Sequence, residues 1–357
     1  MNSFRCVTVC LLLCTFAASA TGAQPIAAAR DGQHDFDFHF GSWKTHISSL
    51  RHTASGTPYW VTMDGTVIVR KIWDGRANLE EVKADGEGAH FEGTALFLYD
   101  PKAHQWSINS ARSADGAISP PPTVGQFKDG RGEFFDQELQ NGKTVLVRMV
   151  WSNITPDSHR FEQAFSSDGG RTWETNFTAS LTRADLPPAV STSAAASSDP
   201  ADPDGQDAFE FAQGTWREHT SRLLHPLTGS HAWIQMDGVS VDKPIWNGRA
   251  NVVELESDGP SGHLELLSLR LYNPQSRQWN LYFATSPVGV LSDAMTGDFH
   301  NGHGEFFAQT TVNGRTVLAR FTVAKLSDTS ALSEQAFSAD GGKTWEVNWI
   351  NRYTRAG

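Results

Sequence analysis

Apolar and polar residues alternate along most of this chain with the two-residue period of β-strands. The segment 144–151 is typical, because its odd-numbered residues are all apolar: Val145, Val147, Met149 and Trp151. Such alternation predicts half-buried strands, and no long helical periodicity accompanies it. One short helix is expected around Asp35–Trp43, with His34 or Asp35 as its N-cap.

Strong turn signals separate the predicted strands. In the first half of the chain they are Asp74-Gly75, Asp85-Gly86, Asp100-Pro101, Asp115-Gly116, Asp129-Gly130, Asn141-Gly142, Thr155-Pro156 and Asp168-Gly169. Asn-Gly and Asp-Gly pairs favour tight hairpins. These turns predict about nine or ten antiparallel strands joined in sequence. Closing such a meander into a barrel removes its unpaired edges. A two-sheet sandwich is the alternative, but it requires long crossovers that the spacing does not show.

One stretch of the chain occurs twice. Residues 162–176 read EQAFSSDGGRTWETN and residues 334–348 read EQAFSADGGKTWEVN, with twelve of fifteen positions identical. Each copy predicts a strand, a turn and a strand, because an Asp side chain accepts backbone N–H bonds and glycine reaches positive φ freely. The motif resembles the Asp-box, a structural hairpin of sialidase propellers. Its copies lie 172 residues apart, which is too far for propeller blades.

The repetition covers two whole domains. Residues 36–43 match 209–216, and the turn WDGRAN at 73–78 matches WNGRAN at 246–251. Between the copies, a stretch rich in Pro, Ala, Ser and Asp has the composition of a linker. The predicted organisation is a signal peptide (1–20), an N-terminal segment (21–35), a first barrel (36–183), a disordered linker (184–208) and a second barrel (209–355).

Several motifs recur in both domains: FDFxxGxW at the start, the W-[DN]-G-R-A-N turn, [DN]-P-x-x-x-x-W, GEFF, and the closing EQAFSxDGGxTWExN. Together they resemble a family of bacterial lipocalin-like proteins that has no established activity. The resemblance implies calycin-like barrels, related more distantly to nitrobindin-type heme barrels. The predicted fold class is therefore all-β, with two tandem antiparallel meander β-barrels that are lipocalin-like. A tandem pair departs from the single-domain form expected of that family.

The N-terminus has the parts of a secretory signal. A charged start is followed by an apolar run of signal length and by Ala18-Ser19-Ala20, so cleavage is expected after Ala20, with Ala23 as the second choice. All three cysteines lie in this segment, so the mature chain is expected to hold no disulfide and no Cys-ligated metal. The predicted location is secreted or periplasmic.

The charge of the chain argues against two classes of partner. It has 29 basic and 40 acidic residues, and removing Arg5 with the signal leaves 28 basic residues and a net charge of −12. Such a chain lacks the basic footprint expected for nucleic acid or for an anionic membrane surface. Apart from the signal, no segment is long and apolar enough to span a membrane.

A small barrel can enclose one small ligand in its lumen. The leading hypothesis is therefore non-catalytic binding of a small, largely hydrophobic molecule in one or both lumens. The candidate ligand-binding residues recur in both copies: Trp43/Trp216, Arg76/Arg249, Asn78/Asn251, Glu81/Glu254, Arg148/Arg320, Glu162/Glu334, Gln163/Gln335 and Asn176/Asn348. An Arg and a Glu on neighbouring strands can pair inside a lumen and orient a ligand's polar end. The alternative places them in cross-strand pairs on the outer face.

Heme binding is the weaker candidate. The resemblance to nitrobindin-type barrels implies an axial His near the end of the chain, and no His follows His159 in the first domain or His303 in the second. No cofactor is therefore expected. The group His34, Asp35, Asp37 and His39 has no recognised metal spacing and no histidine counterpart in the second copy, so no metal site is predicted.

Two further functions stay open. A barrel enzyme, isomerase-like or cyclase-like, is the runner-up by analogy of fold alone, because the chain shows no GxSxG, phosphate-loop or dinucleotide motif and no catalytic residue can be assigned. An interaction module of the cell envelope is the other, with exposed Trp60 and Trp233 as anchors. Contact between the two barrels within one chain is also open.

Overall fold

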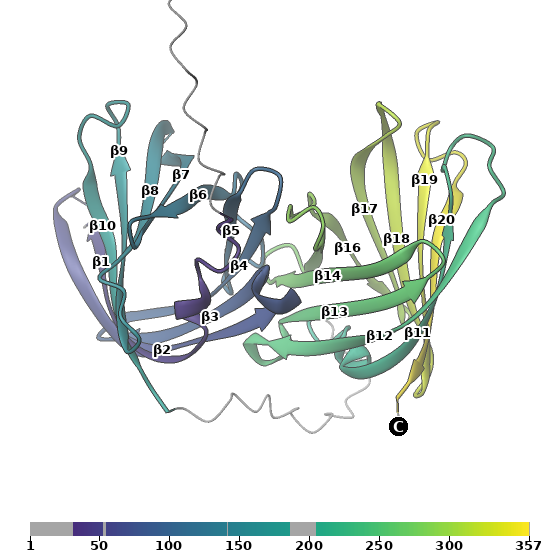
Figure 1. The fold of residues 1–357 in the computed structure, drawn as a ribbon, viewed down its shortest axis with the longest axis horizontal. Helices are drawn as coiled ribbons and strands as arrows, with labels where there is room; N and C mark the ends of the chain where they lie inside the picture. Colours follow the sequence, from purple (N-terminus) through teal and green to yellow (C-terminus); the bar gives the residue numbers. More distant parts are fainter. Residues whose placement is uncertain (1–30, 53–54, 141, 186–204, 357) are drawn as a thin grey trace, which may run out of the picture. The chain divides into compact units, whose positions relative to one another are not determined.

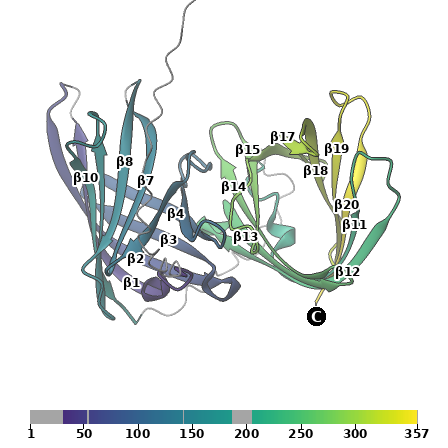
Figure 2. The same ribbon diagram turned by 45° about the horizontal axis from the view of Figure 1, so that its top comes forward.

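The computed structural model describes residues 31–52, 55–140, 142–185 and 205–356. They form two closed antiparallel barrels of ten strands each (Figure 1, Figure 2). Strands adjacent in sequence are adjacent in each sheet, and the first strand pairs with the last to close the barrel. The predicted all-β meander of tandem barrels is confirmed. The predicted signal peptide and the central part of the predicted linker lie outside the described residues.

Each barrel is a series of hairpins. The first comprises β1 (Gly41–His52), β2 (Pro58–Ile72), β3 (Ala77–Gly86), β4 (Ala89–Asp100), β5 (Gln105–Arg112), β6 (Thr123–Lys128), β7 (Arg131–Gln140), β8 (Lys143–Ser152), β9 (Ser158–Ser166) and β10 (Glu174–Arg183). The second comprises β11 (Gly214–Leu223), β12 (Trp233–Ile245), β13 (Ala250–Gly259), β14 (Gly262–Asn273), β15 (Gln278–Thr285), β16 (Met295–His300), β17 (His303–Val312), β18 (Arg315–Ser327), β19 (Ser330–Ser338) and β20 (Glu346–Arg355).

The expected helix at 35–43 is only a single 3-10 turn. This turn, η1 (Asp37–His39), follows Phe36, which makes no side-chain capping bond. Gly41 takes a φ of +106° and begins β1, which a glycine does at little cost. The second barrel repeats the arrangement with η3 (Glu210–Ala212). Two further 3-10 turns, η2 (Trp73–Gly75) and η4 (Trp246–Gly248), contain the repeated W-[DN]-G motif.

The entry segment places an aromatic side chain inside each barrel. Phe36 is fully buried, with ring centroids 4.8 to 5.6 Å from those of Phe97, Trp106, Phe127, Phe134 and Trp151. Phe209 occupies the same position in the second barrel. Because these rings fill part of the interior at close-packed density, only the remainder of each lumen is open to a ligand.

The last hairpin of each barrel is an Asp-capped turn. Asp168 Oδ1 accepts hydrogen bonds from the backbone N–H groups of Arg171 and Thr172 at 3.0 and 2.9 Å, and the Ser166 hydroxyl also donates to it at 2.8 Å. Asp340 makes the equivalent bonds in the second barrel. The prediction that the repeated motif is a structural hairpin is confirmed, because the Asp168 and Asp340 carboxylates accept hydrogen bonds from residues of their own turns.

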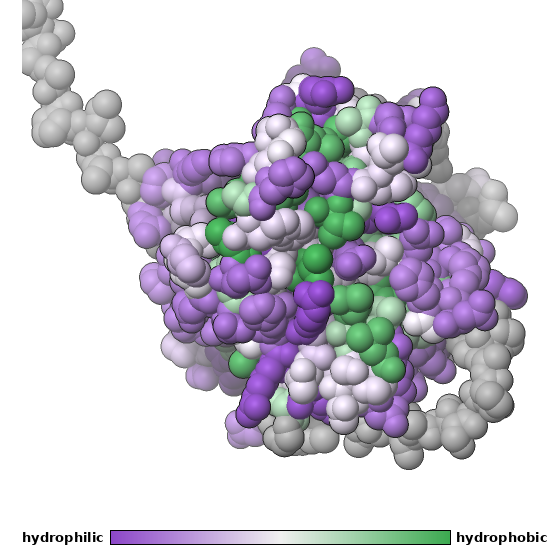
Figure 3. Space-filling model, turned by 90° about the vertical axis from the view of Figure 1, so that its right-hand side faces the viewer, coloured by the Kyte–Doolittle hydropathy of each residue, from purple (hydrophilic) through white to green (hydrophobic). Residues whose placement is uncertain are grey.

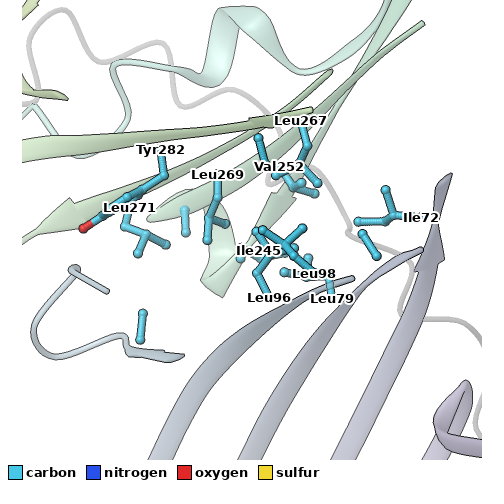
Figure 4. Close-up of a cluster of buried hydrophobic side chains, with 14 of the residues drawn as sticks. Ile72, Leu79, Leu96, Leu98, Ile245, Val252, Leu267, Leu269, Leu271 and Tyr282 are labelled. Atoms are coloured by element: carbon cyan, nitrogen blue, oxygen red, sulfur yellow. The ribbon is translucent and has the colours of Figure 1, made fainter. Parts of the chain in front are cut away.

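The outer faces of the two barrels share one hydrophobic cluster inside the compact unit Asp31–Gly357. It joins side chains of β3 and β4 to side chains of β13 and β14, which Figure 4 shows pointing toward one another. Its members include Leu79, Leu96, Leu98, Val252, Leu269 and Leu271, each at most 1% exposed. The contact between barrels that the sequence left open is therefore present.

Polar contacts across this interface occur in equivalent pairs. Arg76 Nη2 donates to both carboxylate oxygens of Glu265, at 2.9 and 2.7 Å. Arg249, the counterpart of Arg76, pairs with Glu92, the counterpart of Glu265. Contacts in which i meets j and the equivalent j meets i define an isologous interface. The two barrels thus meet through the same surface, as the subunits of a two-fold dimer do.

Candidate functional site: two lumens with different floors

Each barrel encloses a cavity, of about 570 Å³ in the first barrel and about 490 Å³ in the second. The inward positions of most strands line them, as the two-residue alternation requires. The walls of the first cavity are mainly apolar, and include Ile47, Val67, Val82, Met149 and Phe161. Cavities of this size suit a small organic molecule.

Two histidines and a glutamate form a hydrogen-bonded chain beside the first cavity. His39 and Glu80 line the cavity, and His39 Nε2 lies 2.7 Å from Glu80 Oε2. His39 Nδ1 lies 3.1 Å from His159 Nε2. His39 Nε2–H donates to the Glu80 carboxylate, and His39 Nδ1 and His159 Nε2 share the one proton that lies between them. Glu80 is thus the end of the chain that faces the lumen.

His159 is held neutral at the inner end of this chain. Burial lowers its pKa to about 2, and the charges of His39 and Arg183 add to the shift. The Trp43 ring packs edge-on against it at 4.5 Å, and the Arg183 guanidinium covers the Trp43 ring at 3.7 Å. His159 Nδ1 is buried and has no hydrogen-bond partner among the described residues. The aromatic packing therefore excludes a counter-charge that could stabilise a protonated ring.

Within the described residues, further polar groups in the first lumen are free to bind, among them Thr45 and Asp136 Oδ1. Thr45 is 4% exposed and lines the cavity, and its hydroxyl has no partner in the described part of the chain. A buried hydroxyl without a partner is costly unless water or a ligand satisfies it. Thr45 and Glu80 therefore offer a donor and an acceptor beside the apolar residues of a wall that also includes Arg112, Asp115, Asp136 and Glu138.

The second lumen has a charged wall instead. Arg270 and Glu218 line the cavity, and both are buried. Arg270 Nη1 lies 3.2 Å from Asp242 Oδ2, so one carboxylate matches the guanidinium. Glu218 Oε1 accepts from the Thr220 hydroxyl at 3.2 Å. Among residues 205–356, no Lys, Arg or His forms an ion pair with Glu218.

Burial shifts the titration of these acids upward. It raises the pKa of Glu218 to about 7, although the hydroxyls of Thr220 and Ser240 and the charge of Arg270 oppose the shift. It raises the pKa of Asp242 to about 6 against the attraction of Arg270. Tyr353, which lines the same cavity, has its pKa raised above the usual value by burial and by the charge of Glu218.

The buried polar residues that distinguish the two lumens occupy different positions on the shared fold. The hydrogen-bonded residues His39, Glu80 and His159 are replaced in the second barrel by Ala212, Val253 and Ala331. Conversely, the positions of Glu218, Asp242 and Arg270 are held in the first barrel by Thr45, Val69 and Phe97. The duplicated barrels therefore share their fold and differ in the chemistry of their lumens.

Of the residues predicted to bind ligand, Gln163 and Gln335 line the cavities. Their strands turn Glu162 and Glu334 to the other face, as alternation demands. Glu162 accepts from the Thr175 hydroxyl at 3.2 Å. Asn176 Nδ2 lies 3.4 Å from Gln163 Oε1.

Most of the other predicted residues contact protein groups, but both polar side-chain atoms of Asn78 lack a hydrogen-bond partner among the described residues. Arg76 and Arg249 each pair with a glutamate across the interface between barrels, and Glu81 and Glu254 pair with Arg70 and Lys243. Arg148 and Arg320 cover the rings of Trp173 and Trp345, while the indole N–H groups of Trp43 and Trp216 donate to the carbonyls of His39 and Ala212. The side chains buried outside the cavity linings are those of Asn78, Asn251 and Asn348. The cross-strand alternative thus describes the placement of Glu81 and Glu254. Ligand binding by this set as a whole stays a prediction.

The residues that distinguish the lumens are not among the predicted ligand-binding residues. The predicted residues recur in both copies, whereas His39, Glu80, Glu218 and Arg270 each occur in one copy only. His39 was considered only with His34, Asp35 and Asp37, as a group without metal spacing, yet this side chain is 1% exposed. A search for polar residues at inward strand positions, where the period predicts apolar ones, would have found Glu80 and Glu218.

The described residues contain no group of three or more His, Cys, Asp or Glu arranged to hold a metal ion. Nor does any helix in that part of the chain have the length and apolarity to cross a membrane. Trp60 and Trp233 are 49% and 37% exposed, as the interaction-module alternative requires. On the face drawn in Figure 3, hydrophobic side chains are interspersed with hydrophilic ones.

No protein-family model and no curated protein matches this chain. Among solved structures, it is similar to an S-type phycobiliprotein lyase from Guillardia theta, with 11% identity, a TM-score of 0.32, and coverage of 44% of this chain and 96% of the lyase. It is also similar to a protein of unknown function from the DUF3598 family of Nostoc punctiforme, with 10% identity, a TM-score of 0.26, and coverage of 92% of this chain and 100% of that protein. The similarity to the protein EF1p2_mFAP2b bound to DFHBI has 9% identity and a TM-score of 0.25, and covers 43% of this chain and 99% of that protein. Similarity this weak carries no argument, so the barrel architecture rests on strand pairing, and the lipocalin-like family stays a prediction.

Proposed function

We propose that this protein is a secreted or periplasmic, non-catalytic binding protein that holds a small, largely apolar molecule in the lumen of its first barrel. The observation that carries the proposal is a cavity of about 570 Å³ whose walls are more apolar than polar and whose polar groups include Glu80 and Thr45. Apolar contact supplies the free energy of binding, and a few polar groups orient the ligand.

The polar groups restrict the head group of this ligand. Glu80 already accepts from His39 and can accept a second hydrogen bond through its free lone pairs. A carboxylate head would meet the like charge of Glu80. The lining also holds Arg112, but its carboxyl groups at Asp115, Asp136 and Glu138 outnumber that guanidinium, which disfavours fatty acids. A hydroxyl can donate to Glu80 and accept from Thr45. The ligand class that fits is therefore an apolar molecule that carries a single alcohol or phenol group.

A displacement titration tests this function. The apolar dye N-phenyl-naphthylamine is bound to the full chain, and decanol and decanoate are compared as competitors. Decanol should displace the dye at concentrations at least about tenfold lower than decanoate, which corresponds to about 1.4 kcal/mol. No dye binding, or preferential displacement by decanoate, contradicts the proposal.

Matched variants assign the binding to one lumen. Ala95→Trp fills the first cavity, and Ser268→Trp places the same side chain at the equivalent position of the second. Ala95→Trp should abolish the decanol-sensitive signal, and Ser268→Trp should preserve it. Ser110→Phe is a second blocking variant, since Phe283 already occupies the equivalent cavity position. If Ser268→Trp abolished the decanol-sensitive signal and Ala95→Trp preserved it, the ligand would lie in the second barrel and the proposal would be wrong.

Export is part of the proposal and has its own test. The supporting observation is the signal pattern that ends at Ala20. Mass spectrometry of the protein recovered outside the cytoplasm should find a mature chain that begins at Thr21. Recovery of the full-length chain from the cytoplasm alone would contradict export without affecting ligand binding.

A further inference from the structure

The second lumen has a charge arrangement that the proposed function does not use. Three ionisable side chains, Glu218, Asp242 and Arg270, lie buried together on β11, β12 and β14. Arg270 and Asp242 form a pair at 3.2 Å, so their charges offset each other. Glu218 is the remaining carboxylate, and it faces the cavity with only hydroxyl groups as hydrogen-bond donors.

Several buried polar atoms in this lumen also lack a partner. Ser268 is 2% exposed and lines the cavity, and its hydroxyl has no hydrogen bond within the described residues. Arg270 Nε, on another cavity-lining side chain, is likewise without a partner there. Buried polar atoms are normally satisfied. The Ser268 hydroxyl can accept from an ammonium group, whereas Arg270 Nε can only donate, so it is Ser268 that marks a place where such a ligand would be held.

We infer that the second lumen is a separate binding site for a ligand with a positively charged amino group, whose ammonium pairs with Glu218. A buried carboxylate without a counter-ion is costly, and the ligand supplies the cation that the protein does not. A carboxylate ligand fits poorly, because Arg270 is already matched by Asp242 and Glu218 would repel it. Phe283, Phe321 and Trp349 line the same cavity and suit an aromatic or apolar body.

Proton release should accompany binding. Glu218 is partly protonated near neutral pH, because burial raises its pKa to about 7. An ammonium beside it favours the ionised form, so the free protein gives up a proton when the amine binds. The charged and titratable groups that act on Glu218 are Arg270 and Tyr353, and Asp242 pairs with Arg270.

Calorimetry with three matched indoles tests the inference: tryptamine, tryptophol and indolepropionate carry an ammonium, a hydroxyl and a carboxylate respectively. The full chain should bind tryptamine at least about tenfold more tightly than indolepropionate. At about pH 6, titrations in phosphate and in imidazole buffer should differ in heat by the amount expected for proton release. Failure to bind tryptamine at millimolar concentration, or equal affinity for indolepropionate, overturns it.

The variants separate this site from the first lumen. Glu218→Gln keeps the shape of the side chain and should weaken tryptamine binding at least about tenfold and abolish the proton release. Glu218→Thr, which installs the residue of the first barrel, should do the same. Ser268→Trp should block tryptamine, whereas Ala95→Trp should leave it bound. Tryptamine binding that survives Ser268→Trp and disappears with Ala95→Trp refutes the second site and leaves the decanol result unaffected.

Discussion

At the scale of single residues, the two barrels bury ionisable groups that respond to pH in opposite directions. His159 in the first barrel is kept neutral, with a pKa lowered to about 2. Glu218 in the second barrel is kept protonated up to a pKa of about 7. The folded chain therefore leaves His159 unprotonated and keeps Glu218 protonated at pH values where the unfolded chain does the opposite. Each difference in proton binding makes the free energy of unfolding depend on pH.

Replacing His159 should remove an acid-sensitive contribution to stability. The unfolded chain protonates this histidine below about pH 6.5, while the folded chain does not, so acid favours unfolding by about 1.4 kcal/mol for each pH unit below that value. Urea unfolding of the wild type and of His159→Gln between pH 7.5 and 5.5 measures it. The variant should lose less stability than the wild type as pH falls, and His52→Gln, at an exposed histidine, should behave as the wild type.

Replacing Glu218 should have the opposite effect. The folded state holds the Glu218 proton that the unfolded chain releases above about pH 4.5, so this contribution to stability declines as pH rises from about 4.5 to 7 and is on the order of 1 kcal/mol per pH unit. Glu218→Gln should therefore gain stability relative to the wild type over that range. A constant difference between the two proteins across the range would show that Glu218 is ionised throughout.

These residues also mark the limit of reading single positions from sequence. The positions of Glu80 and Glu218 on strands follow from alternation, but the approach of His39 to both Glu80 and His159 joins residues 41 and 120 positions apart. Such separations are set by closure of the barrel, which no local pattern encodes.

At the scale of elements, the closing hairpin is specified almost wholly by its own residues. Asp168 makes all of its bonds within the turn, and these bonds lower its pKa to about 2. The second copy at Asp340 has the same geometry and the same lowered pKa. Local turn chemistry therefore allowed the hairpin to be predicted from fifteen residues of sequence.

Asp168→Ala should loosen one hairpin only. The N–H groups of Arg171 and Thr172 lose their acceptor, so their hydrogen exchange should accelerate, while the amides of Lys343 and Thr344 in the second hairpin keep their protection. Asp340→Ala should give the mirror result. Exchange measured residue by residue by NMR decides the matter, and faster exchange in both hairpins of either variant would argue against local control.

At the scale of the whole molecule, the interface between barrels explains why some polar residues recur. Arg76 and Arg249 occur at matching positions because each pairs with a glutamate of the other barrel. Gly116 and Gly289 recur for a related reason. A Cβ atom at either glycine would collide with the backbone carbonyl of Tyr272 or Tyr99 respectively. Recurrence within the chain reports a shared interface as readily as a shared ligand site.

The common cluster predicts that both barrels unfold together. Because Leu96 is fully buried between them, calorimetry of the wild type should show a single transition. Leu96→Asp buries a charge in the cluster, which is expected to cost at least about 3 kcal/mol and to split the transition in two. Leu326→Asp, at a residue that is 62% exposed, should leave it single. Two well-separated transitions in the wild type would show that the cluster does not couple the barrels.

By itself the sequence determined the β-strands, their hairpin order, the duplication and the Asp-capped turns, since these depend on periods and contacts within a few residues. The tertiary structure decided which polar side chains face a lumen, how the barrels meet, and that His39 and Glu218 are buried. Those features depend on the closure of β1 on β10 and of β11 on β20, and on the packing of two outer faces. Each joins residues far apart in the chain, where alternation states only that a side chain lies on one face or the other.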